Sequence, residues 1–370
     1  MDWVKLVKKS KSEFKCKKIF TMCIFNMKQD SYKKFEEEYY VPMLKLLNGL
    51  QKLFPDWGFI IYIDYFMIKT NYNLVKDLLN KYDENSRFLI YFYFIPKFLN
   101  EDNTNHEGTS GTMVRFIPFF DEENKYDIMW CIDIDELMNM FVITKKYFLD
   151  VFLEKKDVEF MVLSNTLHRY LSRYPLNKKY LIVAKGFVSK VQFPAYLLVN
   201  FMSPDRIKYD YEVERYAKGK KMSRRFPYGG DEWFLNTSLY DYIERKNMNV
   251  MVVIYPLIDF IGSLRWCSEE INEIMKRGDV YRKMAELGQL SGYIYNYEFD
   301  SLDSPKLKTV WNKYKELALV IRLIIVNELN KKNFNIDKLD ERCRGKLLEL
   351  YKVNKLYTKD LPPMYYKIIN

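Results

Sequence analysis

The sequence predicts an α/β fold, in which a mostly parallel, Rossmann-like sheet is flanked by helices and followed by a C-terminal helical extension. Between residues 18 and 262, short apolar runs rich in β-branched and aromatic residues alternate with segments of helical periodicity. Strands that alternate with helices favour a parallel sheet covered on both faces. From residue 268 onward the pattern is helical. We therefore expect a basic N-terminal segment at 1–17, an α/β domain at 18–262 and a helical extension at 263–370.

The apolar runs place the individual strands. Each is short, apolar and rich in β-branched or aromatic residues, and these runs cover residues 18–25, 58–67, 87–95, 158–163 and 250–258. Helices are expected after the first strand, as far as about Leu53, and at 73–82. The apolar segment 180–191 contains Gly186, which indicates a strand pair or a close backbone approach.

Two further helices are expected near the middle of the chain. In residues 111–120 one helical face carries apolar side chains, Arg115 points elsewhere, and Pro118 kinks or ends the helix. Thr144 is expected to cap a helix whose buried stripe contains Phe148, Val151 and Phe152.

Composition and charge narrow the classes of protein. The chain has 370 residues, a net charge of +10 and a hydrophobic fraction of 48%, which describe a folded protein that tolerates or attracts anionic partners. Its five cysteines contain no CxxC pair, so neither a zinc site nor a disulfide framework is indicated. Seven lysines precede Ile19 without an apolar segment behind them, so no secretory signal is predicted. No apolar run approaches the roughly 20 residues that span a bilayer. A cytoplasmic protein is expected.

The acidic pair Asp133 and Asp135 ends an apolar run that begins at Ile128. Side chains alternate along a strand, so the two carboxylates would point the same way and repel each other unless a cation lies between them. A hard divalent ion with oxygen ligands is the obvious candidate. A solvated acidic loop that begins a helix at Glu136 is the alternative.

Other polar residues also follow predicted strands. Ligands of open α/β sheets bind outside the carboxyl ends of the strands. If the sheet is parallel there, these residues converge with the acidic pair on one region: Asn26, Asn165, His168 and Asp259.

Three blocks resemble a known family. Residues 111–121 (GTMVRFIPFFD), 127–135 (DIMWCIDID) and 230–236 (GDEWFLN) look like the R-F-x-P, D-x-D and D-Q-x-F-L-N blocks of nucleotide-sugar glycosyltransferases of the GT-A fold, closest to capsule- or virus-type members. The resemblance covers about residues 18 to 262.

The resemblance implies a metal site and a donor site. In that family the Asp-x-Asp motif holds a divalent metal, commonly Mn²⁺ (or Mg²⁺), which bridges the diphosphate of the sugar donor and acts as a Lewis acid. Asp135 would be the direct metal ligand, and Asp133 would contact the donor or reach the metal through water. Asn26 would lie near the nucleoside. Arg115 would pair with the donor sugar or diphosphate, or it is a surface arginine.

The block at 230–236 implies the catalytic carboxylates. Asp231 and Glu232 would lie beside the acceptor or the sugar, and an inverting enzyme needs one of them as general base. The alternative is that Asp231 caps a helix over 232–243. Many metal-dependent members also supply a late histidine ligand, which this chain lacks after His168; Asp259 is the proposed substitute, or it caps a loop.

Two other functional assignments each have a structural alternative. Asn165 and His168 would face the substrate, although a lone histidine after a strand is more often a structural hydrogen-bonding group. A basic loop over 218–225 could grip diphosphate or form a solvated face.

The expected function is therefore transfer of a sugar from a nucleoside-diphosphate donor to a hydroxyl of a glycan or protein. We expect the donor to be a UDP-sugar, and we expect no nucleic-acid partner. One alternative is metal-dependent nucleotidyl or phosphoryl transfer by paired aspartates. Another is an inactive scaffold whose helical tail, with an amphipathic segment at 311–329, binds a partner or contacts an anionic membrane peripherally.

Overall fold

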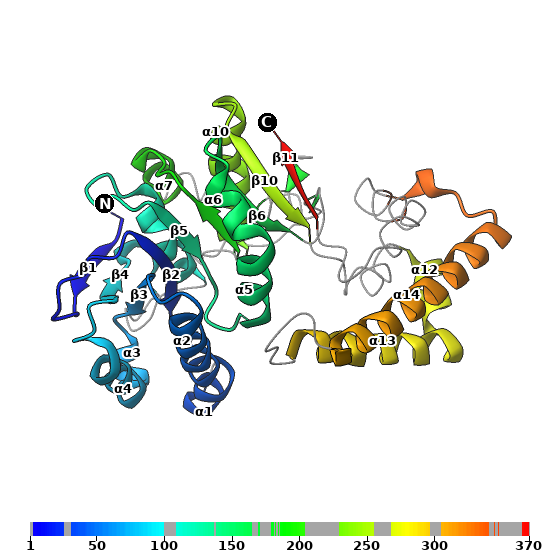
Figure 1. Cartoon of the computed structure of the whole chain (residues 1–370), viewed down its shortest axis with the longest axis horizontal. Helices are drawn as coiled ribbons and strands as arrows, with labels where there is room; N and C mark the ends of the chain where they lie inside the picture. The colour runs from blue at the N-terminus through cyan, green and yellow to red at the C-terminus, as the bar shows by residue number, and fades with distance from the viewer. Residues whose placement is uncertain are drawn as a thin grey trace.

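The computed structural model (Figure 1) describes residues 3–25, 31–99, 109–136, 138–164, 169–170, 179–180, 182, 184, 186–203, 229–254, 268–296, 305–339, 344, 347 and 365–369. Within these residues the chain forms one large sheet, helices on both of its faces, and a group of helices formed by the later residues.

The sheet has nine strands in the order β1-β4-β3-β2-β5-β9-β6-β10-β11. Their bounds are β1 Lys5–Lys8, β2 Lys18–Ile24, β3 Gly58–Asp64, β4 Phe88–Phe94, β5 Ile128–Cys131, β6 Val158–Ser164, β9 Phe187–Ser189, β10 Asn249–Ile254 and β11 Tyr365–Ile369. A separate pair joins β7 (Arg169–Tyr170) to β8 (Lys179–Tyr180). Every strand expected from the apolar runs is present, and their described ends lie within a few residues of the expected ones; residues 255–258 of the last expected strand lie outside the described residues.

Strand directions bring the expected polar residues to one edge. β3 is parallel to β2 and to β4, β2 is parallel to β5, and β6 is parallel to β10. The short strand β9 lies antiparallel between β5 and β6, so β5 and β6 also run the same way. The prediction of a mostly parallel sheet is therefore confirmed, and the carboxyl ends of these six strands lie at one edge.

The strand order reverses between β2 and β5. From β2 the chain adds β3 and then β4 on one side, and it afterwards returns to place β5 on the other side of β2. Connections that leave in opposite directions at adjacent strands define a topological switch point, the place where open α/β sheets bind ligands. The residues that follow β5 therefore occupy this position.

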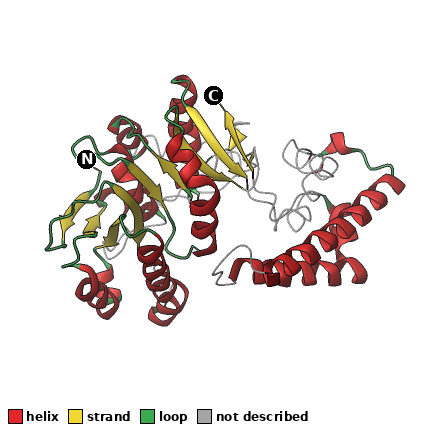
Figure 2. Ribbon diagram, viewed as in Figure 1, coloured by secondary structure: helices red, strands yellow, loops and turns green. Residues whose placement is uncertain are grey.

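Helices cover both faces of the sheet (Figure 2). One face packs against α2 (Val41–Leu53), which continues α1 (Tyr32–Phe35) through a π-helical turn, and against α4 (Tyr72–Tyr82) and α6 (Asp150–Glu154). The other face packs against the 3₁₀ helix η3 (Ser110–Phe120), α7 (Ala195–Phe201), α9 (Gly230–Phe234) and α10 (Tyr240–Arg245). Short helices α3 (Met67–Thr70) and η2 (Pro96–Phe98) follow β3 and β4.

Alternation along the strands explains why the sheet needs two covered faces. In β2, Phe20, Met22 and Ile24 join the core under α2, whereas Ile19 and Cys23 join the core under η3. Phe20 lies at the centre of an aromatic cluster, with ring centroids 4.7 Å from Trp57 and 5.4 Å from Trp130. Burying an aromatic side chain of this kind stabilises the fold by about 1.5–3 kcal/mol.

The later helices have a core of their own. α12 (Glu269–Lys276), α13 (Gly278–Asn296) and α14 (Pro305–Lys331) pack around buried apolar side chains that include Ile274, Tyr314 and Ile325, and a short 3₁₀ turn (Ile336–Lys338) follows. The predicted helical extension is confirmed. An unexpected feature follows it, because β11 pairs antiparallel with β10 and so returns the end of the chain to the sheet. Among the described helices, none combines the length and apolar character needed to cross a membrane.

Two local predictions about helices are wrong. Residues 110–120 form a 3₁₀ helix that is buried on nearly all sides, Arg115 included, rather than an amphipathic helix with one buried face. Thr144 does not cap a helix: it ends α5 (Met138–Thr144), which continues into a π-helical turn and α6, and its Oγ1 donates to the Met140 carbonyl at 2.6 Å. A threonine hydroxyl that finds a carbonyl one turn earlier can occupy a helix interior.

Candidate functional site

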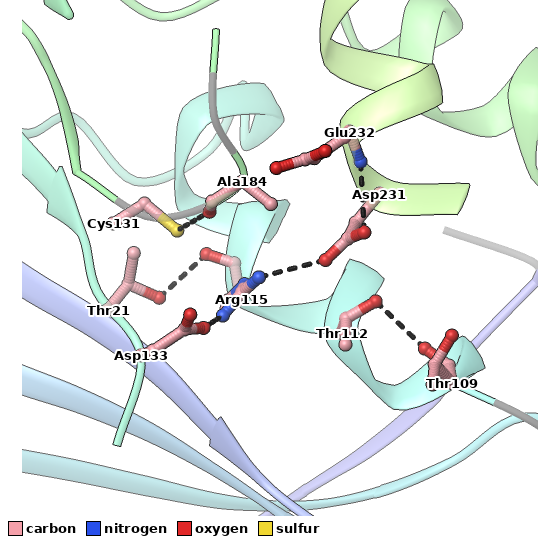
Figure 3. A network of polar contacts seen from close by, with 9 residues as sticks. All are labelled: Thr21, Thr109, Thr112, Arg115, Cys131, Asp133, Ala184, Asp231 and Glu232. Carbon is pink, nitrogen blue, oxygen red and sulfur yellow. Dashed lines mark hydrogen bonds and ion pairs between the residues drawn. The ribbon is translucent and has the colours of Figure 1, made fainter. Parts of the chain in front are cut away.

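Arg115 joins the three sequence blocks that the resemblance singled out (Figure 3). Its side chain lies on η3 and is 4% exposed. Nη1 donates to Oδ1 of Asp133, which follows β5, and Nη2 donates to Oδ2 of Asp231 on α9 at 3.0 Å. Asp133 and Asp231 lie 18 and 116 positions after Arg115 in the chain, and both contact its guanidinium. Two charge-assisted hydrogen bonds from one planar fork hold the three elements in a fixed relation.

The position of Asp133 follows from strand alternation, but that of Asp135 does not. Met129 and Cys131 in β5 face the core under η3, so Asp133, two residues on, continues toward Arg115. The strand ends at Cys131, and residues 134 and 135 form a turn. The expectation that Asp133 and Asp135 share one strand face is therefore wrong, because the chain turns at residues 134 and 135. Asp133 is partly exposed and Asp135 is exposed.

Asp231 is held by its own helix as well as by Arg115. Gly229, at φ +81°, precedes α9, and this left-handed conformation suits glycine because it has no Cβ. Asp231 therefore lies in the first turn rather than at the cap, and the predicted capping role is wrong. Its Oδ1 accepts from the Glu232 N–H at 2.9 Å, and its side chain is 11% exposed. The helical segment runs from Gly230 through a π-helical turn (Leu235–Leu239) to Arg245, longer than the expected 232–243.

The helix that carries Arg115 is held at two points, at Arg115 itself and near the first residue of the helix. Thr21 of β2 donates its hydroxyl to the Arg115 carbonyl at 2.8 Å. At Gly111, a Cβ would come 2.3 Å from Oη of Tyr93 and 2.9 Å from the Phe25 ring, so only glycine fits there. Such close packing explains how an eleven-residue 3₁₀ helix persists, since this helix type is usually restricted to short pieces.

Burial controls the ionisation of the groups around Arg115. Burial raises the pKa of Cys23 and of Cys131 to about 12, against the opposing effect of the guanidinium, so both side chains are neutral thiols at neutral pH. Burial of Arg115 opposes its charged form, but the negative charges that Cys131 and Cys23 carry at high pH, together with Asp231, outweigh this and raise the pKa of Arg115. The arginine is therefore a permanent cation between two acidic side chains.

The carboxylates can be tested for a fit to the divalent metal that the family resemblance implies. Among the residues that the structure describes, no group of three acidic, histidine or cysteine side chains could by itself hold a metal ion. Asp133 has one oxygen on Arg115, and Asp135 is exposed. Mg²⁺ and similar ions that act on phosphates are commonly held by one or two carboxylates, with the substrate phosphates completing the shell. Asp135 and the second oxygen of Asp133 are the carboxylate oxygens that could contribute to a site of that kind, and they do not form a cage built from protein ligands alone.

Several predicted site residues lie outside the described residues: Asn26, Asn165, His168, Asp259 and the basic loop over 218–225. The structure does describe the strands that precede the first four. β2, β6 and β10 end at Ile24, Ser164 and Ile254. All three ends lie at the edge of the sheet where Asp133 follows β5. Their assignments remain predictions.

The residue-level interpretation missed two positioning groups. Asn236, at the end of the 230–236 block, accepts from the Ile182 N–H at 2.9 Å and donates to the Ile182 carbonyl at 2.6 Å. It thereby ties α9 and its π-helical turn to the segment before β9, where the Cys131 thiol also donates to the Ala184 carbonyl at 3.6 Å. The other missed group is Thr21. Its one available signal was a hydroxyl within an otherwise apolar run.

Comparisons with known proteins leave the family open. No protein-family model matches the sequence, and no curated protein matches it. Among solved structures, the chain is similar to 4-diphosphocytidyl-2C-methyl-D-erythritol synthase from Anaerococcus prevotii DSM 20548, at 9% sequence identity, covering 64% of this chain and 86% of that chain, with a TM-score of 0.31. A similarity at this level assigns neither activity nor substrate.

Proposed function

We propose that this protein is a transferase that acts on a nucleoside-diphosphate sugar and passes the sugar to a hydroxyl acceptor, with a divalent cation at Asp133 and Asp135. The observation that supports it is the guanidinium of Arg115, which gathers the three sequence blocks beside the switch point of a mostly parallel sheet. The blocks that the resemblance assigns to the donor and to the acceptor therefore meet at one place.

The charges suit a divalent cation. Asp133, Asp135 and Asp231 carry three negative charges, and Arg115 offsets one of them. A bound divalent cation would offset the remainder and supply Lewis-acid stabilisation to a departing nucleoside diphosphate. The protein's own residues then have simpler tasks: Asp135 offers an exposed carboxylate, Arg115 fixes the direction of Asp133, and the acidic first turn of α9 would lie beside the acceptor.

The deciding experiment is a donor panel with Mn²⁺ and the full chain. We expect release of the nucleoside diphosphate from a nucleotide sugar, and thermal stabilisation by the same donor. Asp135→Asn should reduce turnover at least about 100-fold, because loss of a group at a metal site costs 10- to 100-fold even in its outer shell. The same variant should keep the melting temperature of the parent, since the side chain is exposed.

Asp127→Asn is the matched control. Asp127 is exposed and precedes the same strand, β5, at its opposite end, so the substitution removes an equal charge away from the site. Full turnover by Asp135→Asn would refute the proposal. Release of pyrophosphate from nucleoside triphosphates would instead support nucleotidyl transfer. Failure to bind either class, together with sedimentation on anionic liposomes, would support the scaffold alternative.

A further inference from the structure

We infer that one exposed face of α14 is a docking surface for an anionic lipid bilayer. The inference goes beyond the proposed function and does not depend on it. This docking face consists of three apolar side chains, Leu319, Val320 and Leu323, and two lysines, Lys313 and Lys331.

Apolar residues occupy two opposite sides of α14, which lies alongside α13 (Figure 1). One side is buried in the core of the extension, and its residues follow the three- and four-residue spacing of a single helix face: Tyr314, Ala318, Ile321, Ile325 and Leu329. Leu319, Val320 and Leu323 lie on the other side, with 37%, 41% and 49% of their surface exposed. The core of the extension is therefore complete without these three side chains, and none of the described residues covers the exposed part of their surface.

The charges of α14 are mainly positive. The helix contains five lysines and one arginine against two glutamates. Lys313 and Lys331 lie seven residues before and eleven residues after Val320, and both spacings are close to whole numbers of helical turns, so the two lysines share its face. Their side chains are 62% and 73% exposed, and their surface ion pairs with Glu286 and Glu328 hold them only weakly. A face that is apolar in the middle and positive toward both ends suits the interface of an anionic membrane.

The size and the charge of the docking face favour a bilayer over a second copy of the chain. A stable protein interface buries about 800 Å² on each partner and involves about 20–30 residues a side, far more than this face offers. Two copies that met through α14 would also bring two positively charged helices together. Anionic headgroups instead attract the lysines, and the acyl region accepts the two leucines and the valine.

The fold attaches the docking face to the edge of the sheet that carries the candidate site. Ile254, at the end of β10, pairs with Tyr365, at the start of β11, so the segment that contains α14 joins the sheet at one place. That place is the carboxyl edge, where Asp133 follows β5. Among the described residues, the core of the extension shares no member with the two cores of the sheet. A bilayer bound to α14 would therefore hold the chain through its ligand-binding edge without disturbing the packing of the sheet.

Flotation of the full chain with lipid vesicles tests the inference. We expect binding to phosphatidylcholine vesicles that contain about 30% phosphatidylserine, and binding at least about tenfold weaker to phosphatidylcholine alone. Binding should fall as the salt concentration rises from about 0.1 M to about 0.5 M, because salt screens the lysines. Val320→Gln/Leu323→Gln should weaken binding to the anionic vesicles at least about tenfold, since it removes two of the three apolar side chains that enter the bilayer. Glu316→Gln should strengthen binding, because Glu316 is exposed one turn before Val320 and repels anionic headgroups.

Leu6→Gln/Val7→Gln is the matched control. It also removes one leucine and one valine, from β1, where these side chains are 38% and 52% exposed. The control should bind the vesicles like the parent. All four substituted positions are exposed, so both double variants should keep the thermal melting curve of the parent in circular dichroism.

Three results would overturn the inference. The first is a parent chain that binds neither kind of vesicle, or both equally well. The second is a Val320→Gln/Leu323→Gln variant that binds like the parent, or a control that loses as much, because another surface then binds the lipid. The third is a parent that is dimeric by light scattering and a Val320→Gln/Leu323→Gln variant that is monomeric, since the face then joins two copies.

The proposed function is decided separately, by the panel of nucleotide sugars. A chain that binds anionic vesicles through α14 but no nucleotide sugar would refute that function and keep this inference. A chain that releases nucleoside diphosphate but binds no vesicle would do the reverse.

Discussion

Replacing Arg115 with methionine tests whether the ion pairs hold the site together. Methionine is comparable in length and apolar, so the substitution removes the cation without a large change in volume. It leaves Asp231, whose side chain is 11% exposed, without its guanidinium, and it also releases Asp133, whose side chain is 31% exposed. Breaking a buried pair by removing one partner costs about 3–5 kcal/mol, because the other charge stays buried without compensation. The more exposed Asp133 can be hydrated and adds at most about 1 kcal/mol.

A loss of that size is a large part of the total stability of a typical protein, about 5–15 kcal/mol. Urea unfolding followed by tryptophan fluorescence reports on it, because Trp57 and Trp130 are buried in the core beside the sheet. The companion variant Arg115→Met/Asp133→Asn/Asp231→Asn removes all three charges. It should recover at least half of the lost free energy of unfolding, since a neutralised group is far cheaper to bury than an unpaired charge. A loss below about 1 kcal/mol for Arg115→Met, or no recovery in the companion, would refute the reasoning.

Two further predictions concern the packing of η3 and the helical extension. Gly111→Ala places a Cβ 2.3 Å from Oη of Tyr93 and should lower the free energy of unfolding by about 1–3 kcal/mol. Gly288→Ala in α13, where nothing lies within 4 Å of the new Cβ, should instead raise it by about 0.5–1 kcal/mol. Equal effects of the two substitutions in thermal melts would contradict this. Hydrogen bonds from Lys331 and Arg277 lower the pKa of Glu328 from 4.5 to about 2. Because the pKa in the folded protein is the lower one, the carboxylate stabilises the extension above its unfolded pKa of about 4.5, and this contribution is lost as the pH falls toward 2. Glu328→Gln should remove that part of the pH dependence of helix unfolding followed by circular dichroism, and an unchanged profile would count against the assignment.

The sequence alone determined the class of fold and the places where chemistry should be sought. Apolar runs and helical periods are local properties, so they placed the six parallel strands close to their observed positions and predicted a helical pattern where α12, α13 and α14 lie. The three blocks around residues 115, 133 and 231 were recognisable for the same reason, since each is a continuous stretch of chain.

Contacts between distant segments decided the rest. η3 is a 3₁₀ helix and Arg115 is buried because Tyr93, Thr21, Asp133 and Asp231 surround that helix, and none of them is near it in sequence. The antiparallel insertion of β9 and the return of β11 also depend on hydrogen bonds to strands far along the chain. A residue's pattern can show that it is charged or apolar, but the partner that satisfies its charge is supplied by the tertiary structure. Asp231 illustrates this, because its contact with Arg115 joins residues 116 positions apart in the chain.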